Sequence, residues 1–158
     1  MTGTLGGLFA SLGSLLKGNL SLVRLIRFNT HVDPRGALTA IEGETDVPFA
    51  IRRLFYVHRV AAGGDRAGHA HPDTDQVLIA ISGALDVEVK DPDNSGSFRL
   101  DDPGVGLYVP PMVWVRLYNF TTGAVCLAAA STHYVPEAVL RDWEVYRRRA
   151  AEAGMARA

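Results

Sequence analysis

The sequence predicts an all-β domain, either a sandwich or a barrel, that is followed by a helix at its C-terminus. Short segments rich in branched and aromatic residues recur along the chain, and turns containing Gly, Pro, Asp or Asn separate them. Regular spacing of short strands is typical of sandwiches and barrels. The pattern changes over residues 137–153, which contain neither Gly nor Pro and place apolar side chains at helical spacing. We therefore expect one domain over residues 22–158, preceded by an apolar extension over residues 1–21.

Each expected strand is bounded by residues that favour turns. The strands are expected at residues 22–28, 37–42, 51–60, 75–81, 84–90, 97–100, 106–109, 113–119 and 125–131. Asp33-Pro34-Arg35-Gly36 predicts a turn, because Pro presets φ and Gly tolerates positive φ. Ser82-Gly83 predicts a hairpin that joins the strands on either side of it. Pro136 is expected to begin the C-terminal helix.

The overall charge argues against two classes of partner. The chain has 158 residues, a net charge of −1 and a pI of about 6.5. Without a strong basic field, neither nucleic acid nor an anionic membrane is an expected partner. Residues 1–16 carry no charged side chain, but they are too few for a membrane span, which needs ~20 apolar residues. Their apolar residues at helical spacing predict a short N-terminal helix, and we expect a cytoplasmic protein.

Two spaced motifs resemble the paired signature of the cupin β-barrels. The motifs are Gly63-x5-His69-x-His71-x4-Gln76-x6-Gly83 and Gly104-x5-Pro110-x4-Val115-x3-Asn119. The resemblance implies a jelly-roll barrel, also called a double-stranded β-helix. In metal-binding cupins the positions of Gln76 and Val115 carry Glu and His. The resemblance therefore implies a cupin scaffold in which half of the metal site is missing.

His69 and His71 are the strongest candidates for chemistry. Alternate residues of a strand share a face, so both imidazoles are expected to point into the barrel. Imidazole can bind a metal ion or carry protons near neutral pH. A catalytic metal usually needs three protein ligands, whereas Gln76 is a weak donor and Val115 supplies none. The sequence therefore favours acid–base chemistry without a metal or other cofactor, and a purely structural histidine pair is the alternative.

Other side chains are candidates for contacts with a substrate. Arg66 lies three residues before the histidine pair, where a guanidinium would suit a phosphate. Arg52 and Arg53 are adjacent in a strand, so at most one of them can point inward. Tyr56 can position a sugar hydroxyl or relay a proton, and Trp114 can stack on a base or a sugar ring. Core packing is the competing explanation for both aromatic residues.

Several strings of residues together resemble the sugar-nucleotide 3,4-ketoisomerases, the cupins that act on dTDP-4-keto-6-deoxyglucose. The strings are Asp33-x-Arg35-Gly36-x-Leu38, Pro48-Phe49-Ala50-Ile51-Arg52-Arg53-Leu54-Phe55-Tyr56, Arg66-Ala67-Gly68-His69-Ala70-His71, Gly106-Leu107-Tyr108-Val109 and Ala130-Ser131 before Tyr134. The resemblance runs from about residue 22 to about residue 147. It implies a metal-free homodimer that can exchange its N-terminal strands between subunits.

The resemblance also implies a reaction in deoxysugar biosynthesis. One histidine of the pair would remove the proton from C3 of the sugar, beside the C4 ketone, and a proton would return at C4. Carried over by position, the catalytic residues would be His69, His71 and Tyr56, and the residues that bind the nucleotide sugar would be Arg66, Arg53, Arg35, Trp114 and Gln76. Two alternatives stay open, namely a non-catalytic cupin that binds a sugar nucleotide and an epimerase of 4-keto sugars.

Overall fold

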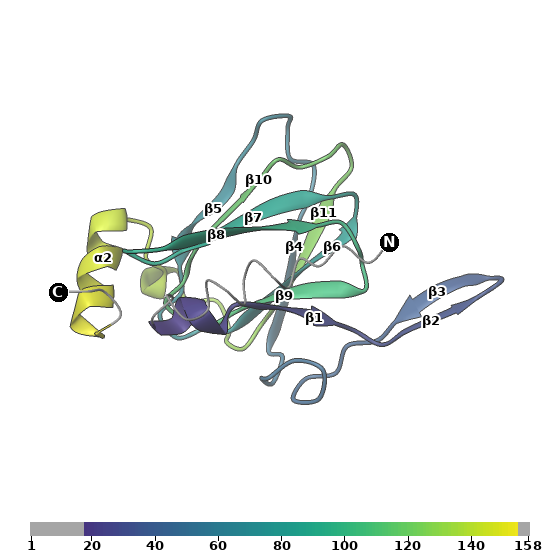
Figure 1. The fold of residues 1–158 in the computed structure, drawn as a ribbon, viewed down its shortest axis with the longest axis horizontal. Helices are drawn as coiled ribbons and strands as arrows, with labels where there is room; N and C mark the ends of the chain where they lie inside the picture. The colour runs from purple at the N-terminus through teal and green to yellow at the C-terminus, as the bar shows by residue number, and fades with distance from the viewer. Residues whose placement is uncertain (1–17, 155–158) are drawn as a thin grey trace.

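A computed structural model describes residues 18–154, which fold into a two-layered β-barrel with a helix at one end (Figure 1). Its strands are β1 (Arg24–Arg27), β2 (Thr30–Asp33), β3 (Gly36–Thr39), β4 (Arg53–Val57), β5 (Arg66–Ala70), β6 (Gln76–Ser82), β7 (Leu85–Lys90), β8 (Ser95–Leu100), β9 (Val105–Val109), β10 (Trp114–Tyr118) and β11 (Val125–Ala130). Two 3₁₀ helices, η1 (Gly18–Leu22) and η2 (Pro136–Ala138), and the helix α2 (Trp143–Glu152) complete it. The expected all-β fold with a C-terminal helix is confirmed, while the helix expected before residue 17 lies outside the described residues.

Two antiparallel sheets form the barrel. One has the strand order β1-β9-β6-β11-β4 and the other has the order β5-β10-β7-β8. The predicted hairpin at Ser82-Gly83 is wrong, because β6 and β7 belong to different sheets. Gly83 has a φ of +62°, and a Cβ atom there would lie 2.6 Å from the Thr121 hydroxyl oxygen. This tight bend carries the chain from one layer across to the other.

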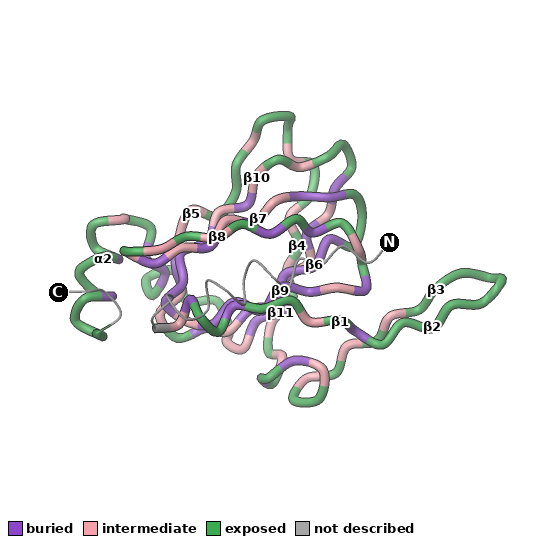
Figure 2. Tube along the Cα trace, viewed as in Figure 1, coloured by how far each residue is buried: buried purple, intermediate pink, exposed green. Residues whose placement is uncertain are grey.

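The core lies between the two sheets and follows the alternation of the strands. In β7 the buried residues Leu85, Val87 and Val89 alternate with partly exposed residues, as expected for a strand with one face on the core. In β6, by contrast, both faces are buried, which explains its continuous apolar run. Its outer face packs under a second cluster that includes Phe28, Val47 and Phe49. Figure 2 shows buried stretches along the strands of the barrel, whereas β2 and β3 are mostly exposed.

The helix α2 begins later than the sequence suggested. Pro136 begins only the short 3₁₀ helix η2, and the following residues are extended, with Leu140 paired to Ala70 of β5. Asp142 is the N-cap, since its carboxylate accepts hydrogen bonds from the backbone N–H groups of residues 144 and 145. The fully buried Tyr146 then docks the helix, because its hydroxyl donates to the carbonyl oxygens of Lys90 and Met112.

The strands β2 and β3 form a separate hairpin that projects away from the barrel (Figure 1). Every residue of β2 is exposed, and so are most residues of β3. Val32 and Leu38 on this hairpin are 77% and 61% exposed, which is unusual for large apolar side chains. Within residues 18–154, no helix has the length and apolar character that a membrane span requires.

Candidate active site

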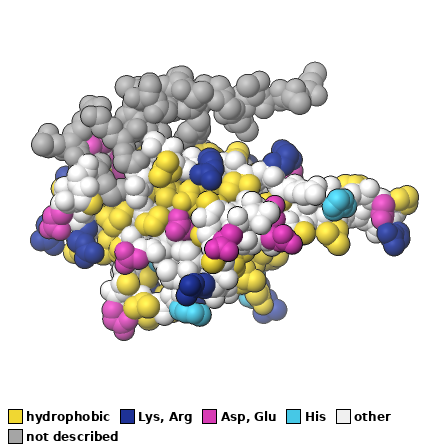
Figure 3. Space-filling view, turned by 90° about the horizontal axis from the view of Figure 1, so that it is seen from below, with side chains coloured by type: hydrophobic (Ala, Val, Ile, Leu, Met, Phe, Trp, Pro, Cys, Tyr) yellow, Lys and Arg dark blue, Asp and Glu magenta, His cyan; other side chains and the backbone are white. Residues whose placement is uncertain are grey.

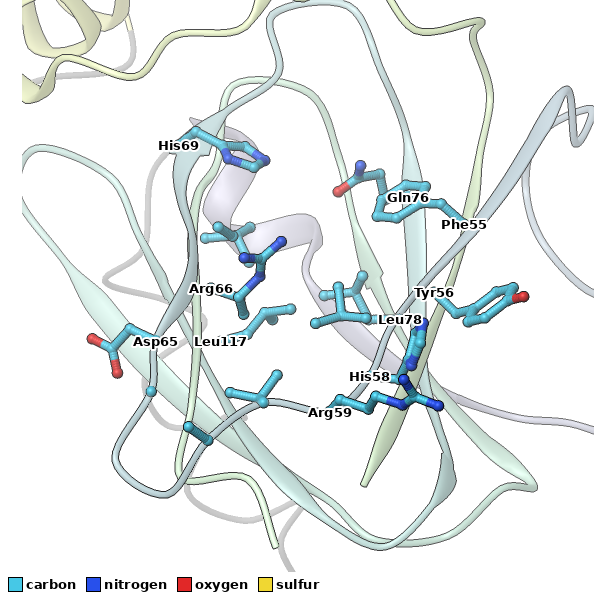
Figure 4. A pocket seen from close by; sticks show the side chains of 16 residues that line it. Phe55, Tyr56, His58, Arg59, Asp65, Arg66, His69, Gln76, Leu78 and Leu117 are labelled. Carbon is cyan, nitrogen blue, oxygen red and sulfur yellow. The ribbon is translucent and has the colours of Figure 1, made fainter. Parts of the chain in front are cut away.

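Two adjoining cavities open at the barrel. The larger, of about 600 Å³, is lined by β4, the loop from β4 to β5, and the inward faces of β5, β6 and β10 (Figure 4). The smaller, of about 380 Å³, is lined by Arg53, Phe55, His69, His71, Tyr134, Val139 and Arg141. Phe55 and His69 border both cavities, so the histidine pair lies where the two meet.

His69 and His71 lie side by side, as the spacing predicted. Their ring centroids are 4.8 Å apart and the ring planes are nearly perpendicular, at 88°. His69 pairs with Val115 of β10, a residue of the core between the sheets, so its imidazole faces inward. His71 directly follows β5, and its carbonyl oxygen accepts a hydrogen bond from the backbone N–H of Met112. Contacts with β10 and with Met112 just before it therefore hold the backbone at both histidines.

The surroundings keep both imidazoles neutral at pH 7. Burial, together with the charges of His69, Arg53 and Arg141, lowers the pKa of His71 to about 4. Burial also lowers the pKa of His69, and the charge of Arg141 adds to the effect. A neutral imidazole can accept a proton, so the pair is present in the form that a general base requires.

A bulge in β5 determines where Arg66 points. His69 lies opposite Val115 and Arg66 lies opposite Leu117, so three steps along β5 match two steps along β10. The segment between them includes Gly68, with a φ of +77°, and behaves as a β-bulge. In a regular strand, residues three apart would face opposite sides. Here Arg66 and His69 both border the larger cavity (Figure 4).

Arg53 and Gln76 approach the histidine pair from the other sheet. Both lie beside Ala130 of β11, Arg53 on β4 and Gln76 on β6, so they share the inward face. The Arg53 guanidinium lies between the rings of Phe55 and Tyr134, at 5.2 and 5.1 Å from their centroids. Within the described chain, the Nε atom of Arg53 and the amide nitrogen of Gln76 are buried without a hydrogen-bond partner. Of the adjacent pair Arg52 and Arg53, only Arg53 therefore points inward.

Arg141 is a site residue that sequence reasoning missed. It borders the smaller cavity, and its guanidinium donates hydrogen bonds to the Tyr134 hydroxyl at 3.0 Å and to the Pro136 carbonyl oxygen at 3.1 Å. The predicted helix, beginning at Pro136, would have contained Arg141. Asp142 is a good N-cap residue, and this signal could have ended the extended segment at Arg141 instead.

Tyr56 is not brought to the histidine pair. Alternation along β4 turns Arg53 and Phe55 inward and leaves Leu54 and Tyr56 each 62% exposed. Figure 4 shows the Tyr56 ring pointing away from the cavity at its rim. In this chain its phenol cannot relay a proton to His69, so the structure argues against its expected catalytic role.

Trp114 lies outside the cavities, and its expected stacking role is wrong. In β10 the residues Val115 and Leu117 take the inward face, so Trp114 faces the C-terminal helix. Its ring centroid lies 5.2 Å from that of Trp143 and 5.4 Å from that of Tyr146. Core packing, the competing explanation, accounts for this residue.

Arg35 lies at the tip of the projecting hairpin. Its side chain is 90% exposed and pairs with Asp33, which lies two residues earlier. It borders neither of the two cavities beside the histidine pair. Within one chain, therefore, the structure does not bring Arg35 to the candidate site.

The donors gathered beside the histidine pair are neutral or cationic. Among residues 18–154, no group of three or more His, Cys, Asp or Glu side chains could hold a metal ion. Gln76 contributes an amide and Val115 contributes no donor. A site that works without a metal or another cofactor stays a prediction.

Comparison with known proteins assigns the chain to a family. The family model described as "FdtA: WxcM-like, C-terminal" matches residues 21–151. A TDP-4-oxo-6-deoxy-alpha-D-glucose-3,4-oxoisomerase of Aneurinibacillus thermoaerophilus is 32% identical over 132 residues, which are 84% of this chain and 95% of that protein.

Solved structures agree with this assignment. The sugar 3,4-ketoisomerase QdtA of Thermoanaerobacterium thermosaccharolyticum, in complex with TDP, is 38% identical with a TM-score of 0.81, over 83% of this chain and 96% of that one. The TDP-quinovose 3,4-ketoisomerase WlaRB of Campylobacter jejuni is 33% identical with a TM-score of 0.77, over 80% of this chain and 97% of that one. This chain belongs to the FdtA/WxcM-like family.

Proposed function

We propose that this protein is a sugar-nucleotide 3,4-ketoisomerase, which moves the keto group of a nucleotide-linked 4-keto-6-deoxyhexose from C4 to C3 in deoxysugar biosynthesis. The observation that carries the proposal is the pair of neutral, half-buried imidazoles between two cavities that arginines border. The names of the relatives support the reaction type, since they are 3,4-oxoisomerases and 3,4-ketoisomerases of TDP-linked sugars.

The proposed chemistry is a balanced tautomerisation. A neutral imidazole of the histidine pair removes the proton from C3, and the electron pair of that C–H bond forms a C3=C4 double bond. The former C4 carbonyl becomes the oxygen of an enediolate. A protonated imidazole then delivers a proton to C4, while the C3 hydroxyl becomes the new ketone and its proton passes to the C4 oxygen, which becomes a hydroxyl. No oxidant or reductant is consumed, so the two imidazoles suffice as proton carriers.

The arginines suit the diphosphate of a nucleotide sugar. Arg66 borders the larger cavity, and Arg53 and Arg141 border the smaller one. Guanidinium groups bind phosphate oxygens through paired hydrogen bonds. The unpartnered Nε atom of Arg53 is a donor that a phosphate or sugar oxygen can use. We assign these three arginines to substrate binding, with TDP as the proposed nucleotide.

Proton exchange in deuterium oxide tests the reaction. The protein is incubated with TDP-4-keto-6-deoxyglucose, and the sugar is followed by NMR. We expect a ketone at C3 and deuterium at C4, because the proton that returns to C4 comes from an imidazole in exchange with solvent. Deuterium at C5 instead would indicate an epimerase, and tight binding without exchange would indicate a non-catalytic sugar-nucleotide-binding protein. Either of these results overturns the proposal.

The exposed apolar surface supports a homodimer. Leu25, Leu54 and Ile81 lie on the five-stranded sheet and are 43%, 62% and 45% exposed. The projecting hairpin adds Val32 and Leu38, and hydrophobic side chains are visible on both the hairpin and the barrel in Figure 3. An isolated two-stranded hairpin is at best marginally stable in water. We infer that the hairpin is exchanged and packs on a second copy of the chain.

An exchanged hairpin would carry Arg35 to the partner's active site, and complementation tests this. We expect Arg35→Ala and His69→Asn to be nearly inactive when expressed separately. Co-expression should restore about a quarter of the wild-type activity, because half of the dimers are mixed and each mixed dimer has one intact site. A monomer in light scattering, or a mixture without restored activity, would contradict a shared site.

A further inference from the structure

We propose that the Gln76 carboxamide donates a hydrogen bond to the reacting carbonyl oxygen of the sugar and stabilises the enediolate formed from it. This inference rests on the proposed ketoisomerase function and gives one wall of the cavity a specific role. Gln76 is 5% exposed, and its amide nitrogen has no hydrogen-bond partner within the described chain. Buried polar groups in proteins are nearly always hydrogen-bonded, so an unpaired donor at a cavity wall is expected to bind an acceptor on a ligand.

The position of Gln76 leaves its amide without a protein acceptor. Gln76 begins β6 and lies between Val109 of β9 and Ala130 of β11. These two neighbours, and Leu78 next along the same face, have apolar side chains. The backbone groups of the three strands are engaged in the antiparallel ladders on either side. The available acceptor is therefore one that a bound molecule brings into the cavity.

The amide faces the proton carrier across the same cavity. Gln76 reaches the cavity from the five-stranded sheet, and His69 reaches it from the four-stranded sheet (Figure 4). Val115, which pairs with His69, adds an apolar side chain to the wall. A sugar held in this space has the imidazole on one side, for the proton at carbon, and the amide on the other, for the oxygen. This is the arrangement that enolisation of a ketone requires.

The neutral charge of the amide matters as much as its place. When the C3 proton leaves, negative charge develops on the carbonyl oxygen, and a preorganised N–H donor stabilises that charge. A carboxylate at the same position would repel the oxygen and would raise the pKa of the nearby imidazoles. The amide therefore stabilises the intermediate while His69 and His71 stay neutral and able to accept a proton.

A substitution of similar size separates this role from packing. We expect Gln76→Met to lower kcat by about 10²-fold or more, as the loss of an oxyanion donor does. The KM should stay within about threefold, because the lost hydrogen bond acts mainly in the transition state. The affinity for TDP should also stay within about threefold, since TDP lacks the sugar. Gln76→Glu should be impaired at least as strongly, despite its equal size. Melting temperatures close to that of the wild type would exclude misfolding as the cause.

A spectroscopic test uses the fact that Gln76 is the only glutamine in the sequence. Protein labelled with ¹⁵N-glutamine therefore gives one side-chain NH₂ pair in the NMR spectrum. In the His69→Asn background, which keeps substrate from turning over, TDP-4-keto-6-deoxyglucose should move one of the two amide protons strongly downfield. TDP alone should not produce this shift.

The possible results have distinct meanings. If the wild-type protein does not turn over the substrate, the proposed function itself fails. If the wild type is active and Gln76→Met retains its kcat, the function stands and the role of Gln76 is overturned. The role is also overturned if the amide signals are equally displaced by TDP and by the TDP-sugar, because the sugar oxygen would then not be the acceptor.

Discussion

Replacing either histidine of the pair is expected to lower kcat by roughly 10²-fold or more, because each variant loses acid–base assistance at a carbon centre. Asparagine keeps much of the size and polarity of histidine but cannot take up a proton near neutral pH. His69→Asn and His71→Asn should therefore fold and bind TDP as the wild type does. Single-turnover measurements with TDP-4-keto-6-deoxyglucose would isolate the proton-transfer step from product release.

His133→Asn is the matched control, since it makes the same substitution at an exposed histidine that borders neither of the two cavities. We expect it to retain wild-type turnover. If both substitutions in the pair left the rate unchanged, proton transfer by these imidazoles would be ruled out. If only one were harmful, the same histidine would have to perform both transfers.

The pH dependence gives a second readout for the histidine pair. Because the folded pKa of His71 is lowered to about 4 and that of His69 is also lowered, both bases take up their protons at a lower pH than a free imidazole does. The acid limb of kcat/KM should therefore lie below the ordinary imidazole pKa. The unfolded chain takes up these protons at a higher pH than the folded chain. Stability from the neutral pair is thus present above about pH 6.5 and is lost as pH falls towards the lowered values.

The bulge in β5 gives the second large effect. Inserting one alanine between Arg66 and Ala67 would keep the bulge but shift Arg66 by one position along β5, so that Arg66 would turn to the outer face while His69 still faced inward. Loss of a charged hydrogen bond of about 1.5–3 kcal/mol corresponds to a roughly 10- to 100-fold weaker affinity for TDP, measurable by calorimetry. The kcat at saturating substrate should change much less, because the histidine pair remains in place.

Gly63 offers a control that has similar backbone strain but lies outside the bulge. Gly68 and Gly63 have φ angles of +77° and +75°, and a Cβ atom at either would contact nothing within 4 Å. Gly68→Ala and Gly63→Ala should therefore both lose stability through an unfavourable backbone conformation. Only Gly68→Ala should also weaken TDP binding, because only Gly68 lies between Arg66 and His69. Equal TDP affinity in both variants would show that the bulge does not position Arg66.

The sequence was most informative where the relevant signal is local. Two histidines separated by one residue had to share a face wherever their strand ran, and the structure confirms that they lie together. Breakers between short apolar segments located most of the strands, because turn residues act through their own φ angles. Local alternation likewise limited Arg52 and Arg53 to one inward side chain, which the structure identifies as Arg53.

Tertiary structure decided which way side chains such as Trp114 and Tyr56 face, and to which sheet each strand belongs. Trp114 and Tyr56 were reasonable candidates by type, but β10 turns Trp114 towards α2 and β4 turns Tyr56 to the outer face. The strands around Gly83 resembled a hairpin, although they belong to facing sheets. In each case, local sequence specified a strand but not the partner that the strand packs against.

The site itself shows the same division. By itself, the sequence determined the β fold, the histidine pair and the supply of arginines around it. Only the folded chain brought Arg141 beside the pair through the pairing of Leu140 with Ala70, and only the bulge at Gly68 turned Arg66 inward. The physical reason is that the identity and local geometry of a side chain are set by nearby residues, whereas its neighbours across a cavity are set by strand register over the whole barrel.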